Sequence, residues 1–174
     1  LKNILATQIK TEKELPLVHD LIKEGGITVL VTPIDASAPK GRLILPQQLV
    51  IRDLLDHHLP CVVTQPEELP HLLASLKEPP ALVITDSQAF GIVSKMVPPE
   101  IPLTSFSILM ARQKGFLETA VQGAYAFNHL KDEDTVLIAE GCTHHRQCGD
   151  IGSVKIPRWV EQFSGAKPVY TFTS

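Results

Sequence analysis

The segment Ile27-Thr28-Val29-Leu30-Val31-Thr32 is a short run of apolar and β-branched side chains, as found in strands buried on both faces of a parallel sheet. Similar runs recur at Cys61–Thr64, Ala81–Thr85, Leu103–Ser105, Thr135–Ala139 and Pro168–Phe172. Segments with helical spacing of apolar residues lie between them, at Pro46–His57, Pro66–Lys77, Ser87–Met96, Gly115–Leu130 and Ile156–Phe163. This alternation predicts an α/β fold in which helices flank parallel β-sheets.

The clearest interruption of this rhythm is the proline-rich stretch Pro98-Pro99-Glu100-Ile101-Pro102, which predicts a domain boundary. Residues 1–13 carry no apolar period, as expected of a linker that arrives from another domain. We therefore expect two small tandem units, one over residues 14–98 and one over residues 99–174.

Composition narrows the class of protein. The chain has 174 residues, a formal net charge of −3 and a pI near 6.2, and it shows no basic stripe interleaved with aromatics, so we expect no nucleic-acid partner. No apolar run approaches the roughly 18–20 residues that cross a bilayer, and no signal-peptide pattern is seen, so we expect no membrane partner. Three cysteines, Cys61, Cys142 and Cys148, are too few and odd in number for a disulfide framework, which favours a cytoplasmic protein.

The richest chemical motif is Gly141-Cys142-Thr143-His144-His145-Arg146-Gln147-Cys148-Gly149-Asp150-Ile151-Gly152, directly after the expected strand Thr135–Ala139. In open α/β sheets, ligands bind beyond the carboxyl ends of strands. Thiolate beside imidazole suits zinc, with one more ligand from elsewhere, or an iron–sulfur cluster completed by distant residues. A plain polar loop fits the spacing equally well, and a redox disulfide is a minor alternative. The candidate ligands are Cys142, His144, His145 and Cys148.

Other polar residues have simpler interpretations. Asp35, Lys40 and Arg42 follow the first strand, where an interface loop is favoured over an anion or nucleotide site; no phosphate-binding G-x4-G-K-[ST] pattern occurs. Asp86 is expected to cap the next helix. The pair His57-His58 is expected to serve the helix dipole or face solvent rather than to bind a metal.

Several segments together resemble the HydF family of FeFe-hydrogenase maturation GTPases. The resemblance extends from about Asp20 to Ser174 and rests on Val29–Asp35, Ala38–Gln47, Ile51–Asp56, Cys142-Thr143-His144-His145 and Asp150-Ile151-Gly152. Members of that family have a GTPase domain, a dimerisation domain and a domain that binds a 4Fe-4S cluster. The resemblance implies a linker from the GTPase domain over residues 1–13, the dimerisation domain over 14–98 and part of the cluster domain over 99–174.

The resemblance also implies ligands for the cluster. The family motif is Cys-x-His followed, several tens of residues later, by His-Cys-x-x-Cys, and Cys142 and His144 match its first half. The second half does not occur in these residues, which by themselves hold an incomplete cluster site; Cys148 is not part of the motif. The GTPase domain, with its GTP and Mg²⁺, is absent from these residues as well.

By the same resemblance, the chain is a non-catalytic part of a scaffold. The family receives a di-iron precursor made with two radical-SAM maturases and delivers it to the apo-hydrogenase. A homodimer through residues 20–100 is expected, with the helix face around Leu49, Ile51 and Leu55 as a supplementary contact. The competing hypothesis is a small zinc-dependent α/β hydrolase, in which Cys142, His144 and Asp150 surround a zinc-bound water.

Overall fold

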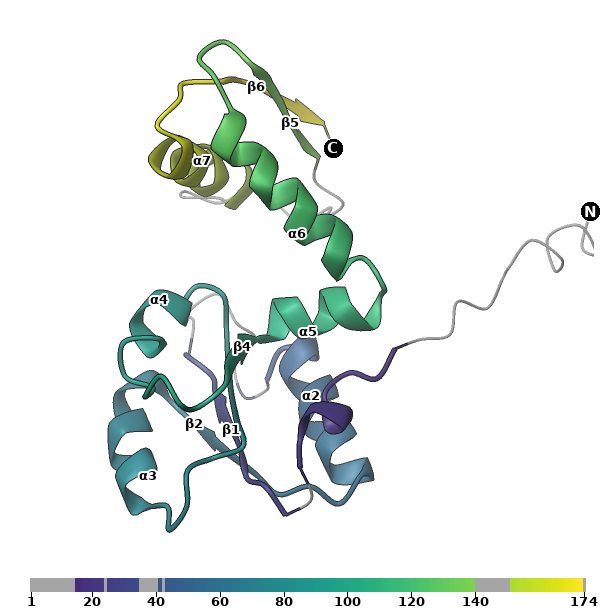
Figure 1. Cartoon of the computed structure of the whole chain (residues 1–174), viewed down its shortest axis with the longest axis vertical. Helices are drawn as coiled ribbons and strands as arrows, with labels where there is room; N and C mark the ends of the chain where they lie inside the picture. The colour runs from purple at the N-terminus through teal and green to yellow at the C-terminus, as the bar shows by residue number, and fades with distance from the viewer. Residues whose placement is uncertain (1–14, 24, 35–40, 42, 140–150, 174) are drawn as a thin grey trace, which may run out of the picture. The chain divides into compact units, whose positions relative to one another are not determined.

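The computed structural model describes residues 15–23, 25–34, 41, 43–139 and 151–173. The chain divides into two compact units, Leu1–Leu117 and Glu118–Ser174, each of which is considered by itself (Figure 1). Among the described residues, no helix is long and apolar enough to cross a membrane.

The first unit is built on a four-stranded sheet with the order β2-β1-β3-β4, in which every pairing is parallel. Its strands are β1 (Thr28–Val31), β2 (Cys61–Thr64), β3 (Leu82–Thr85) and β4 (Leu103–Ser105). The two central strands, β1 and β3, are buried at every position, as their unbroken apolar runs predict. The structure thus confirms the predicted α/β class.

Helices cover both faces of this sheet (Figure 1). They are η1 (His19–Leu21, a 3-10 turn), α2 (Leu45–Asp56), η2 (Pro66–Glu68, a 3-10 turn), α3 (Leu69–Ser75), α4 (Phe90–Val93) and α5 (Phe106–Gln113). Successive strand residues point to opposite faces, so β1 contributes Leu30 to one core cluster and Val29 and Val31 to the other. The first cluster packs against α2 and α5, and the second against α3 and α4.

Helix α5 is a feature that the strand and helix patterns of the sequence did not predict. Its N-cap is Ser105, whose Oγ accepts a hydrogen bond from the Ile108 amide at 3.3 Å. The helix buries Phe106 and Leu109 in the same cluster as β1 and β3. Because β4 and α5 complete this core, the first unit continues to Leu117, and the expected boundary at residues 98–102 is instead a link between α4 and β4.

Three predicted helices are shorter than their apolar spacing indicates; of these, the helix expected over Gly115–Leu130 is α-helical only from Leu117 to Ala126. The expected helix over Ser87–Met96 is reduced to α4, with Gly91, a poor helix former, inside it. Its N-cap is Ala89, which makes no side-chain capping bond, so Asp86 does not occupy the predicted capping position. The expected helix over Pro66–Lys77 becomes η2 followed by α3, which ends at Ser75.

The second unit contains a two-stranded parallel sheet of β5 and β6, in which Thr135 is in register with Val169. Its elements are α6 (Leu117–Ala126), η3 (Phe127–His129), β5 (Thr135–Ala139), η4 (Ile151–Lys155, a π-helical turn), α7 (Ile156–Ser164) and β6 (Val169–Thr173). Helix α7 ends at Gly165, whose φ of 72° is the left-handed conformation typical of a glycine after a helix. The Tyr170 hydroxyl donates to the Pro157 carbonyl at 3.0 Å and ties β6 to α7.

Large apolar side chains remain exposed on this second unit. Tyr125 is 65% exposed, Leu137 62% and Phe163 68%, although each belongs to a helix or strand. We call the following set the second-unit apolar residues: Val121, Tyr125, Leu137, Trp159, Phe163, Val169 and Phe172. Ile138 and Val160 are buried, so the unit has a small core of its own.

Candidate functional site

The residues first expected to form a site are not among those that the structure describes. Cys142, His144, His145 and Cys148, together with Asp150, fall outside the described residues, in the segment between β5 and η4. The loop residues Asp35, Lys40 and Arg42 after β1 also fall outside them. The predictions for both loops therefore stay predictions.

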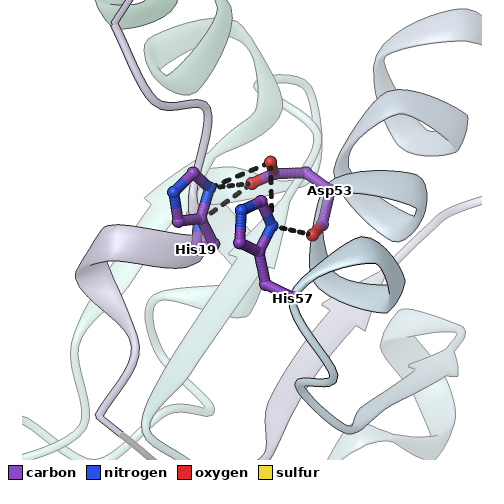
Figure 2. A group of neighbouring side chains, drawn as sticks. All are labelled: His19, Asp53 and His57. Carbon is purple, nitrogen blue, oxygen red and sulfur yellow. Dashed lines mark hydrogen bonds and ion pairs between the residues drawn. The ribbon is translucent and has the colours of Figure 1, made fainter.

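Within the described residues, ligand-type side chains meet at a cluster formed by His19, Asp53 and His57 (Figure 2). We call it the His–Asp cluster. His19 belongs to η1, Asp53 lies in the last turn of α2, and His57 is the residue that caps the end of α2. The helix places Asp53 and His57 on one face because residues four apart are neighbours on a helix surface.

Asp53 holds η1 in place through its carboxylate. One oxygen, Oδ2, accepts hydrogen bonds from the amides of Val18 and His19, both at 2.9 Å. The first amides of a helical turn have no hydrogen-bond partners within the turn. Here the Asp53 carboxylate, from a helix far away in the sequence, accepts their hydrogen bonds. The other oxygen, Oδ1, lies 3.0 Å from His19 Nδ1.

The second imidazole completes the cluster. His57 Nδ1 lies 2.8 Å from the Asp53 main-chain carbonyl oxygen and 3.6 Å from Asp53 Oδ1. The rings of His19 and His57 are stacked, with centroids 3.5 Å apart and planes 7° from parallel. The contact of His57 with a carbonyl of the last helical turn agrees with the expected role at the helix end. Its meeting with His19 was not predicted.

Arg112 of α5 also binds the segment that contains η1 and the residues just before it. Its Nη1 donates to the Pro16 carbonyl at 2.9 Å and the Leu17 carbonyl at 3.3 Å, and its guanidinium forms an ion pair with Asp20. The hydrogen bond from Arg112 lowers the pKa of the Asp20 carboxyl below its ordinary value of 3.8, and the same bond raises the pKa of Arg112. We call residues 16–20, held by Asp53 and Arg112, the N-terminal anchor.

A separate polar contact lies at the carboxyl edge of the first sheet. Gln47 of α2 is buried; its Nε2 donates to Asp86 Oδ2 at 2.9 Å, and its Oε1 accepts from the Ile44 amide at 3.2 Å. The strand order places β2 on one side of β1 and β3 on the other, the arrangement that marks a ligand crevice in open α/β sheets. Here Gln47 and Asp86 satisfy each other and join α2 to the end of β3. Sequence reasoning missed Gln47.

The helix face around Leu49, Ile51 and Leu55, expected to add to the dimer contact, is only partly exposed. Leu49 and Leu55 are exposed, by 36% and 59%, and remain available for contact. Ile51 is partly buried and packs against the core, so it belongs to the interior. Cys61 also packs against the core and is partly buried, and this burial raises the pKa of its thiol.

Comparison with known proteins identifies both units. The family model described as the hydrogen maturase F dimerization domain matches residues 17–115. The model described as the hydrogen maturase F tetramerization domain matches residues 118–174. The first match ends at residue 115 and the second begins at residue 118, close to the division of the structure after Leu117. No curated protein matches the chain. The first model alone covers more than half of the sequence, and the chain therefore belongs to the hydrogen maturase F (HydF) family of hydrogenase maturation proteins.

Proposed function

We propose that this chain is the assembly part of a scaffold that binds a 4Fe-4S cluster and transfers a di-iron precursor to apo FeFe-hydrogenase. The observation that carries the proposal is the tandem match to the dimerization and tetramerization domains of one maturation family. The radical-SAM maturases are the proposed suppliers of the precursor, and a GTPase domain elsewhere in the parent protein binds GTP and Mg²⁺. The proposed compartment is the cytoplasm.

The proposed cluster ligands are Cys142 and His144. They follow β5, a strand of a parallel sheet, at the end where α/β proteins place their ligands. Clusters of this type are ordinarily held by four thiolates. A site with three thiolates and a weaker fourth ligand leaves one iron open to exchange, which suits the handover of a metal cargo.

Anaerobic iron–sulfur reconstitution of the full-length parent tests this assignment. The wild type is expected to gain broad visible absorption, and Cys142→Ala is expected to lose it. Cys61→Ala is the matched control, because Cys61 lies in β2 and packs against the core of the first unit. Full absorption in Cys142→Ala would contradict the proposal. Stoichiometric zinc together with hydrolytic activity would favour the zinc hydrolase instead.

The dimer is proposed to form through the outer edge of β2. The main-chain amide of Thr28 donates to the Pro60 carbonyl at 3.0 Å, and that of Thr32 donates to the Thr64 carbonyl at 2.8 Å, so these carbonyls face β1. The N–H and C=O groups of successive residues point to opposite sides of a strand. Those of Cys61 and Val63 therefore face away from β1. No described strand pairs with this edge. Pairing with a second copy about a two-fold axis would satisfy it and continue the sheet.

A further inference from the structure

We infer that the His–Asp cluster is a binding site for a divalent transition-metal ion, best suited to Zn²⁺ and separate from the cysteine-containing segment. Nitrogen from two imidazoles and oxygen from one carboxylate form a donor set that zinc accepts in sites where a fourth position is left to water. The inference does not depend on the proposed transfer of a di-iron precursor.

The donor atoms of the three side chains lie within 4.8 Å of one another, close enough to share one ion after the rings have moved. Asp53 Oδ1 lies 3.0 Å from His19 Nδ1 and 3.6 Å from His57 Nδ1. Zinc bonds of about 2.0–2.2 Å in a tetrahedral arrangement place neighbouring donors about 3.3–3.6 Å apart. The 3.6 Å separation already lies at the end of that range, whereas the 3.0 Å separation is shorter and must lengthen when an imidazole turns to bind the ion.

The two imidazoles meet the Asp53 carboxylate unequally. His19 Nδ1 lies 3.0 Å from Oδ1, whereas His57 Nδ1 lies 3.6 Å from that oxygen and is hydrogen-bonded to the Asp53 main-chain carbonyl at 2.8 Å, a bond that a metal ion on this nitrogen would replace. The Asp53 side chain is only 16% exposed, and within the described ranges no lysine or arginine forms an ion pair with it. A cation bound between Oδ1 and the two rings would neutralise a carboxylate that is largely withdrawn from water.

The carboxylate is already oriented for this task. Its Oδ2 is fixed by the amides of Val18 and His19, and Oδ1 is the nearer of its two oxygens to His19 Nδ1, at 3.0 Å against 3.2 Å. Hydrogen bonds that orient a ligating group are a general property of metal sites. The histidine side chains of residues 19 and 57 are 28% and 44% exposed, so an ion can enter from solvent.

Binding requires a movement of the rings. One ion cannot lie in the planes of two rings that are stacked 3.5 Å apart and nearly parallel, so at least one imidazole must turn out of the stack. Bound metal would link η1 to the end of α2 and so fasten the N-terminal anchor.

The test measures Zn²⁺ binding by calorimetry and Co²⁺ binding by visible absorption. The full chain is used with Cys142, His144, His145 and Cys148 all changed to alanine, so that those candidate ligands cannot contribute. We expect one equivalent of Zn²⁺ and a Co²⁺ spectrum with d–d bands and no thiolate charge-transfer band. Absence of Zn²⁺ binding in this background would overturn the inference.

Matched histidine variants locate the ion. His57→Phe keeps an aromatic ring for stacking but removes the nitrogens, and it is expected to weaken Zn²⁺ binding by at least about tenfold. His58→Asn is the control: His58 is adjacent, exposed and at a φ of 59°, a conformation that asparagine tolerates. Equal binding by both variants would refute the assignment. Asp53→Asn, which retains an oxygen for the two amides, provides a second test and should also lose the Co²⁺ bands.

Discussion

The two units of this chain bury their sheets to very different degrees. In the first unit, β1 and β3 are buried at all four positions each, between helices on both faces. In the second unit, β5 is buried only at Ile138, and no residue of β6 is buried. Parallel sheets are ordinarily covered on both faces. The described residues of the second unit therefore leave most of its parallel sheet uncovered.

This contrast agrees with the description of the second unit as a tetramerization domain. Exposed apolar area of this kind usually marks an interaction surface. The first unit has a closed core and is expected to depend on its own packing. The second unit is expected to depend on association. That division can be tested by comparing how the two units respond to substitution.

The core of the first unit should be far more sensitive to truncation than the surface of the second. Phe106 is 1% exposed and Phe163 is 68% exposed. Phe106→Ala should destabilise the first unit by about 3–5 kcal/mol, because it removes a buried ring and leaves a cavity. Phe163→Ala should change the unfolding free energy of the isolated protomer by less than about 0.5 kcal/mol. Chemical denaturation followed by circular dichroism, at a concentration where the chain is monomeric, compares the two.

The N-terminal anchor should contribute a smaller share of the stability of the first unit. Arg112→Met removes the bonds to Pro16, Leu17 and Asp20, and the loss of such charged hydrogen bonds typically costs about 2 kcal/mol. Arg112→Lys keeps the charge but not the forked geometry, so it should recover only part of that loss. The check is the midpoint of chemical denaturation. A midpoint equal to that of wild type in Arg112→Met would show that the anchor does not stabilise the unit.

The Asp20 ion pair also predicts a dependence on pH. The pKa of the Asp20 carboxyl is lower in the folded chain than its ordinary value of 3.8, so the pair stabilises the fold above that value. This contribution is lost as the pH falls through the folded-state pKa. Asp20→Asn should therefore be destabilised relative to wild type at pH 7, and the difference should disappear in strong acid. Denaturation midpoints measured from pH 2 to 7 would reveal a constant difference if the prediction is wrong.

The edge of β2 should control the dimer. Val63→Pro removes an amide that faces away from β1 and should leave the pairing with β1 intact. Analytical ultracentrifugation at tens of micromolar is expected to show a loss of dimer in this variant. Val63→Thr keeps the amide and serves as the control. A monomeric wild type would contradict the dimer itself, and a dimeric Val63→Pro would move the interface away from this edge.

Strands were predicted well from the sequence, because short apolar runs in a buried parallel sheet have few other interpretations. β2, β4 and β5 have the predicted bounds, and β1, β3 and β6 differ by only a residue or so at an end. Helix α5 was missed although the sequence carries signals for it. Ser105 is a typical N-cap residue, and the buried Phe106 and Leu109 that follow it are spaced as on one face of a helix. Its short length and the nearby prolines obscured that pattern.

The His–Asp cluster was only half visible in the sequence. Asp53 and His57 are four residues apart in a predicted helix, so their proximity follows from helix geometry. His19 lies in a segment without a clear period, and only the three-dimensional fold brings it to α2. The contact spans 34 residues along the chain, which local spacing cannot reveal. The same holds for Gln47 and Asp86, separated by 39 residues.

The smallest expected effect concerns the surface of the second unit and appears in association only. Trp159 of α7 is 48% exposed and is one of the second-unit apolar residues. Trp159→Gln should leave the stability of the protomer within about 0.5 kcal/mol of wild type, because little buried packing is lost. Removing an aromatic side chain from an interface should nevertheless shift assemblies larger than the dimer towards the dimer, since aromatic anchors often dominate binding. Arg158→Gln introduces the same residue one position earlier and should leave the assembly unchanged. Light scattering over a concentration series distinguishes them: equal assembly of both variants would place the tetramer contact away from this part of α7.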